Sequence, residues 1–100
     1  MPNIMVFGVG KDQEDKLIES ICTAIKAGDS EIAETAVVTI VQSRCLSVKD
    51  MRKEMPFLRI SSTNPLHTNK LKNILAPLQK PWEIDVEVGS PITEFIEAPK

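Results

Sequence analysis

Residues 2–26 read PNIMVFGVGKDQEDKLIESICTAIK, and residues 56–80 read PFLRISSTNPLHTNKLKNILAPLQK. Each stretch opens on a proline, continues with β-prone apolar residues, and then shows apolar residues at helical spacing. Aligned without a gap, the stretches match Pro2 with Pro56, Ile4 with Leu58, Val6 with Ile60, Leu17 with Leu71, and Ile21 with Leu75. This repetition predicts a duplicated β-α-β unit, with pseudo-repeats at about residues 2–48 and 56–96.

The composition predicts one globular domain over residues 1–100, because 42% of the residues are hydrophobic and the length suffices for a two-layer core. A net charge of −2 and four aromatic residues give no reason to expect nucleic acid as a partner. No apolar run is long enough for a membrane span, so we expect no membrane partner. Two cysteines and one histidine argue against a metal site, and we expect free thiols, no cofactor and a cytoplasmic location.

The periodicities divide the chain into alternating strands and helices. We expect strands at 3–9, 36–41, 57–61 and 82–88, and a short tail strand at 92–96. The first helix is expected to be capped by Asp12 and to end at Gly28, and a polar connection with room for one helical turn is expected at 42–55. The second helix is expected to end at Pro77 and Pro81, and its apolar positions are Leu71, Ile74, Leu75 and Leu78. The order βαββαβ with right-handed crossovers predicts an α+β fold, with two helices on one face of a four-stranded mixed sheet.

The sheet face away from the helices is predicted to be apolar. The first strand places Met5, Phe7 and Val9 on that face, and the second strand is apolar throughout, as expected for a strand buried on both faces. An uncovered apolar sheet face favours burial in a homo-oligomer. The alternative is a small apolar patch that the 42–55 connection covers within one chain.

A duplicated β-α-β unit, an initial Met-Pro and an open sheet face resemble the tautomerase superfamily, which includes macrophage migration inhibitory factor. The resemblance implies a trimer in which the N-terminal proline, freed by removal of Met1, is the base in keto–enol chemistry of small 2-oxo or enol carboxylic acids. Pro2 occupies that position. Burial beside cations lowers the pKa of such an amine toward neutrality, where a base works best. Alternatively, Pro2 only begins an edge strand, where its missing N–H costs nothing.

Two cations are candidates for binding a substrate carboxylate. Lys11, in the segment KDQEDK, matches the region where 4-oxalocrotonate tautomerase carries a carboxylate-binding arginine, and glycine turns before helices attract anions. Pro2 lies nine residues earlier, roughly 30 Å away along an extended chain, so Lys11 would serve the same site only from a neighbouring subunit. Arg59 is predicted on the open sheet face. The alternatives are that Lys11 is simply solvated and that Arg59 pairs with Glu83, Asp85 or Glu87.

The sequence also departs from the family pattern. Glu31 stands where migration inhibitory factor has a catalytic lysine, the second strand has no arginine, and Pro65 lies near a position whose backbone N–H contacts substrate in the family. These departures favour the alternative hypothesis of a non-catalytic, ferredoxin-like or tautomerase-derived oligomeric binding module.

Overall fold

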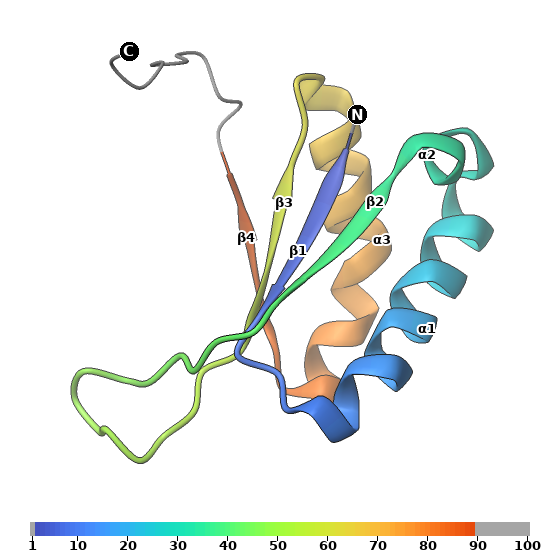
Figure 1. Ribbon diagram of the computed structural model, residues 1–100. Helices are drawn as coiled ribbons and strands as arrows, with labels where there is room; N and C mark the ends of the chain where they lie inside the picture. Colours follow the sequence, from blue (N-terminus) through green and yellow to red (C-terminus); the bar gives the residue numbers. More distant parts are fainter. Residues whose placement is uncertain (1, 90–100) are drawn as a thin grey trace, which may run out of the picture.

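The computed structural model describes residues 2–89 as a single sheet with helices packed on one face (Figure 1). The elements are β1 (Asn3–Phe7), α1 (Lys11–Gly28), α2 (Ser30–Thr35), β2 (Val37–Val41), β3 (Phe57–Ser61), α3 (Pro65–Trp82) and β4 (Asp85–Val88). The strand order is β2-β1-β3-β4. β1 runs parallel to β2, β3 runs parallel to β4, and the central pair β1 and β3 is antiparallel. The α+β class and the four-stranded mixed sheet are therefore confirmed.

The core lies between the sheet and the two long helices. Ile4 and Val6 of β1 and Leu58 and Ile60 of β3 point toward the helices and are almost completely buried. The helices contribute fully or almost fully buried side chains, namely Leu17, Ile21 and Ile25 from α1 and Leu71 and Leu75 from α3. Burying each side chain of this size contributes about 1.5–3 kcal/mol. All the apolar pairs that align between the two halves of the sequence thus meet in one core.

The start of α1 differs from the prediction. The N-cap is Gly10, in an extended conformation, and no side chain caps the helix. Asp12 lies inside the first turn, where a carboxylate interacts favourably with the helix dipole. The helix does end at Gly28. Directly after it comes the short helix α2, which the sequence analysis did not predict and whose Ile32 is buried.

The prediction that Pro77 and Pro81 end the second helix is wrong, because α3 continues to Trp82 with both prolines inside it. Both proline residues are exposed, so their rings do not disturb the buried face formed by Leu71 and Leu75. Each proline removes its own N–H donor from the helix and crowds the carbonyl four residues earlier, and the packing of the apolar face outweighs these losses. Trp82 therefore belongs to α3, and β4 begins later than predicted.

Three further expectations about the sheet face and its connections need correction. β2 is an edge strand and only partly buried, so it is not buried on both faces. Val9 packs against the core instead of the open face, because Gly8 turns the chain at a φ of 73°. Residues 42–56 form no helical turn; they make a two-limbed projection, here called the arm, with a bridge between Leu46 and Glu54. The strand expected at 92–96 lies outside the described residues.

Candidate functional site

Pro2 lies immediately before β1, and its side chain is fully buried. Its carbonyl oxygen accepts the N–H of Val37 at 3.0 Å, which ties the start of β1 to the start of β2. Lys11 is exposed at the first position of α1, beyond the opposite end of β1. Figure 1 shows this separation, with the N-terminus and the start of α1 at opposite ends of the sheet. One chain therefore does not bring the Pro2 and Lys11 side chains together.

Arg59 lies on the open sheet face, in the middle of β3, above a pair of aromatic rings. The rings of Phe7 and Phe57 are stacked, with centroids 4.6 Å apart and planes 11° from parallel. The Arg59 Cζ atom lies 5.1 Å from the Phe7 centroid and 5.6 Å from the Phe57 centroid, within the range of cation–π attraction. The antiparallel register of β1 and β3 places Phe7 opposite Phe57, and the sequence alignment gave no signal of this contact.

Glu87, rather than Glu83 or Asp85, is the carboxylate partner of Arg59. Arg59 Nη2 and Glu87 Oε2 are 3.4 Å apart, and both side chains are partly exposed. A pair of this kind contributes at most about 1 kcal/mol. A guanidinium group has five N–H donors in a planar fork, so one long contact leaves donors for a second carboxylate. Arg59 is thus positioned by the aromatic pair and by Glu87, and retains capacity for an anion.

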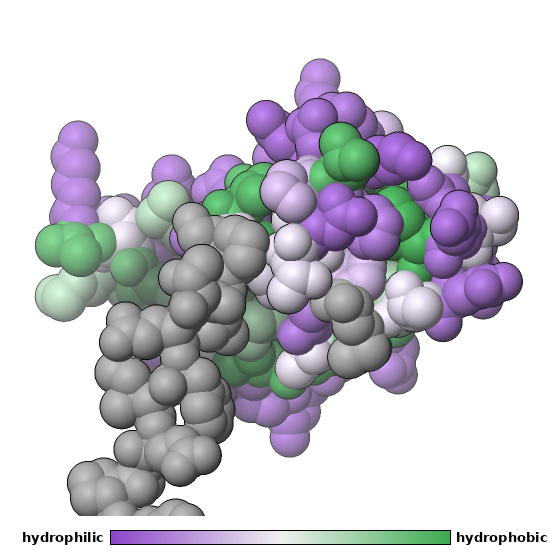
Figure 2. Space-filling model, turned by 90° about the horizontal axis from the view of Figure 1, so that it is seen from above, coloured by the Kyte–Doolittle hydropathy of each residue, from purple (hydrophilic) through white to green (hydrophobic). Residues whose placement is uncertain are grey.

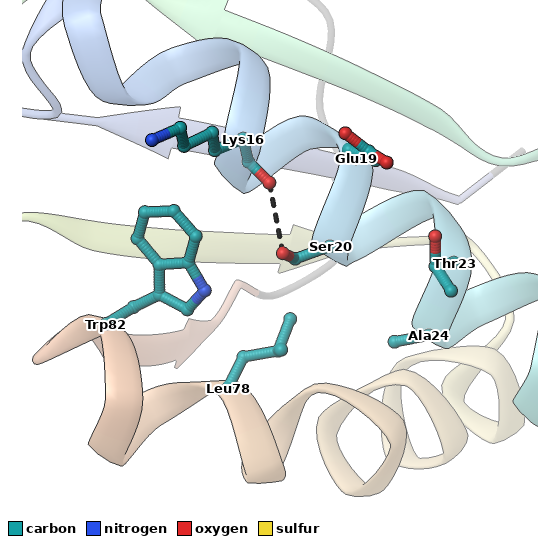
Figure 3. A pocket seen from close by; sticks show the side chains of 7 residues that line it. All are labelled: Lys16, Glu19, Ser20, Thr23, Ala24, Leu78 and Trp82. Atoms are coloured by element: carbon teal, nitrogen blue, oxygen red, sulfur yellow. Dashed lines mark hydrogen bonds between the residues drawn. The ribbon is translucent and has the colours of Figure 1, made fainter.

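A groove lies on the helical side, between α1 and α3, and has a volume of about 620 Å³. It is lined by Lys16, Glu19, Ser20, Thr23, Ala24, Leu78 and Trp82. Figure 3 shows Trp82 and Leu78 of α3 facing Lys16 and Ser20 of α1, where the Ser20 hydroxyl donates to the Lys16 carbonyl at 3.0 Å. None of the three predicted site residues lines this groove. The sequence analysis did not predict this groove, because it placed Trp82 in a strand.

Among residues 2–89, the pKa of one titratable group, Asp29, is clearly shifted, and this carboxylate has a structural role. The backbone N–H of Ile32 donates to Asp29 Oδ1 at 3.0 Å, and this hydrogen bond, assisted by Lys70, lowers the pKa of the Asp29 carboxyl below its ordinary value. Lys70 Nζ lies 3.4 Å from Asp29 Oδ2, so the same carboxylate links α2 to α3.

Within residues 2–89, no three histidine, cysteine or acidic side chains cluster as metal ligands would. In the same range, no helix has the length and apolarity needed to cross a membrane. Cys22 and Cys45 are both free and half-buried.

No protein-family model matches the sequence. A comparison with curated proteins likewise found no match.

Solved structures do match the fold. A fused 4-OT in an asymmetric trimer is 13% identical and superposes with a TM-score of 0.63, over 98% of this chain and 94% of that one. The protein Pt0534 inactivated by 2-oxo-3-pentynoate is 13% identical with a TM-score of 0.59, over 97% of this chain and 90% of that one. A macrophage migration inhibitory factor-like protein from Entamoeba histolytica is 9% identical with a TM-score of 0.56, over 90% of this chain and 86% of that one. The described chain therefore has the fold of the tautomerase superfamily, which includes macrophage migration inhibitory factor.

Proposed function

We propose that this protein is a tautomerase-like isomerase of small 2-oxo or enol carboxylic acids, with Pro2 as the base once Met1 has been removed. One observation carries the proposal: in this fold, Pro2 is fully buried and lies immediately before β1, one of the two central strands. Burial disfavours the charged form of an amine, so a free Pro2 nitrogen would be held in the neutral form that accepts a proton. The Pro2 nitrogen would accept the proton of the enol hydroxyl as the carbonyl forms, and would then return a proton to the substrate carbon. Substrate and product are therefore isomers.

The substrate carboxylate requires a cation beside Pro2, and one chain does not bring Lys11 there. We infer that the protein forms a homotrimer, in which Lys11 of a neighbouring copy and Arg59 attract this carboxylate. The apolar open face supports assembly, since Met5 and Phe7 are only half-buried in the single chain. The fused 4-OT neighbour is itself a trimer.

The first test is the intact mass of untagged protein from its native host, followed by Pro2→Ala. We expect the mass to lack methionine, and the variant to lose ketonisation of phenylenolpyruvate or 2-hydroxymuconate by at least about a hundredfold, as expected for loss of a general base. Pro56→Ala is the matched control, because Pro56 opens the second repeat and should leave turnover unchanged. A retained Met1, or full activity of the Pro2 variant, would reject the mechanism.

A second test uses 2-oxo-3-pentynoate, the compound that inactivates Pt0534. A neutral amine adds to its triple bond without a leaving group, so one whole molecule should be added to the protein mass. Peptide mapping should place that mass on the segment that begins with Pro2. Labelling confined to Cys22 or Cys45 would instead show that only the thiols are reactive.

The second candidate function is a non-catalytic oligomeric binding module, and the groove between α1 and α3 favours it. Trp82 is the only tryptophan of the chain and lines this groove, so its fluorescence reports directly on occupancy. If the protein keeps Met1 and lacks turnover, small aromatic carboxylates that change Trp82 emission would identify this function. Thr23→Phe, which narrows the same groove without adding a second tryptophan, should abolish the change.

A further inference from the structure

The open sheet face changes in character along β1. Its far end carries the stacked rings of Phe7 and Phe57. At the other end, next to Pro2, β1 points its even-numbered residues to the helices and therefore points Asn3 to the open face, where the register places Ser61 of β3 beside it. Figure 2 looks onto this end of the molecule, and hydrophilic and intermediate residues make up most of the surface visible there. The open face is thus polar where it adjoins Pro2.

The Asn3 side chain is held in one orientation by β2. Asn3 is the one polar residue of β1, Thr39 is the one polar residue of β2, and the two side chains are hydrogen-bonded to each other. The Thr39 hydroxyl donates to Asn3 Oδ1 at 3.0 Å in partly buried surroundings. Because Oδ1 is engaged by this hydroxyl, the group that Asn3 can offer to a ligand is its NH2 group, which has two N–H donors.

This NH2 group belongs to the residue that directly follows Pro2. Consecutive Cα atoms are about 3.8 Å apart across a trans peptide bond, and residues 2–89 contain no cis bond. The Pro2 side chain is fully buried, whereas Asn3 is half-buried and so keeps contact with the solvent. A small substrate whose hydroxyl reaches the Pro2 nitrogen is therefore within reach of the Asn3 amide.

We propose that Asn3 is a further catalytic residue of the Pro2 site, and that Thr39 is the positioning residue that orients it. When the Pro2 nitrogen accepts the proton of the enol hydroxyl, negative charge develops on the substrate oxygen, and the Asn3 NH2 group donates a hydrogen bond to that oxygen. A donor that is already oriented stabilises this charge without reorganising during the reaction. This inference rests on the proposed function and adds a residue to the same site.

The first test is the steady-state ketonisation of phenylenolpyruvate by Asn3→Ala. We expect kcat to fall about tenfold to a hundredfold with little change in KM, because the hydrogen bond is strongest when the oxygen carries its charge. Asn73→Ala is the matched control, since Asn73 is an exposed amide on α3 and should leave turnover unchanged. A rise in KM with unchanged kcat would overturn the catalytic role of Asn3.

The near-isosteric variant Asn3→Asp adds a readout that a merely structural role would not move. Its carboxylate repels the developing charge, so kcat should fall further than in Asn3→Ala. The same carboxylate stabilises the protonated form of the neighbouring Pro2 amine, so the acid limb of the pH profile of kcat/KM should move to higher pH. An unshifted profile would contradict the placement of Asn3 beside the Pro2 nitrogen.

Two variants of Thr39 test its positioning role. Thr39→Val removes the hydroxyl at nearly constant volume and should lower kcat about tenfold, whereas Thr39→Ser keeps a hydroxyl and should restore it. Because Thr39 acts through Asn3, the double variant Asn3→Ala with Thr39→Val should be no slower than Asn3→Ala alone. Additive losses would overturn the positioning role.

The outcomes also separate this inference from the proposed function. An active wild-type protein whose turnover is unchanged by Asn3→Ala would overturn the role of Asn3 and leave Pro2 as the base. A processed wild-type protein without turnover would overturn both.

Discussion

Gly8 shows how a single residue determines the path of the chain out of the central sheet. Its φ of 73° lies in the left-handed region, which residues with a Cβ rarely adopt. Its N–H donates to Ser43 Oγ at 2.9 Å. A Cβ at this position would lie 3.1 Å from Cys45 Sγ and 3.3 Å from the Pro56 Cα atom. Gly8 therefore fixes both the turn after β1 and the base of the arm.

We expect Gly8→Ala to lower the free energy of unfolding by about 1–2 kcal/mol, because the added methyl group meets a strained φ and close backbone atoms. The measurement is urea denaturation followed by circular dichroism. Gly10→Ala is the control, since Gly10 has an extended conformation and its nearest obstacle is the exposed Asp12 side chain. Equal losses for the two variants would contradict the role of the positive φ.

At the scale of the element, α2 illustrates a helix that depends on its cap. Its six residues are too few for a stable isolated helix, and only Ile32 is buried. Asp29 compensates by accepting the Ile32 N–H and by contacting Lys70. The sequence contains this signal, since Asp29 precedes an apolar position by three residues, but the stretch lacks the longer periodicity that identified α1 and α3.

The lowered pKa of Asp29 predicts a specific pH dependence of stability. Because the folded-state pKa is below the ordinary value of 3.8, ionised Asp29 stabilises the folded state above that pH. The contribution disappears as the pH falls below 3.8 through the folded-state pKa. We expect Asp29→Asn to lose less stability than wild-type protein between about pH 5 and about pH 2.5, measured by urea denaturation. Identical pH profiles would show that Asp29 does not contribute.

At the scale of the whole molecule, the two β-α-β repeats depend on each other. β1 pairs with β2 of its own repeat and with β3 of the other, and α1 packs against α3. The core side chains Ile4 and Ile60 come from different repeats and lie opposite each other in the central strand pair. Neither half can bury its apolar surface alone.

We therefore expect the fragment of residues 1–48 to lack cooperative unfolding as a monomer, and an equimolar mixture with residues 49–100 to regain it. Thermal circular dichroism with analytical ultracentrifugation measures both. A fragment 1–48 that melts cooperatively as a monomer would show that the first repeat is a domain by itself. A dimer of this fragment would instead replace β3 and α3 with a second copy of β1 and α1.

The sequence by itself determined the α+β class, the duplicated strand–helix pattern and the residues of the core. Apolar residues that recur every 2 residues in strands and every 3.6 residues in helices are local properties of the chain. It also named Pro2, Lys11 and Arg59 as candidates. Only the tertiary structure decided the central position of β1 and β3, the continuation of α3 through Pro77, the choice of Glu87 as partner of Arg59, the groove beside Trp82 and the projection of the arm. These features depend on contacts between residues that are far apart in the chain. The energies of such contacts cannot be inferred from a local sequence pattern.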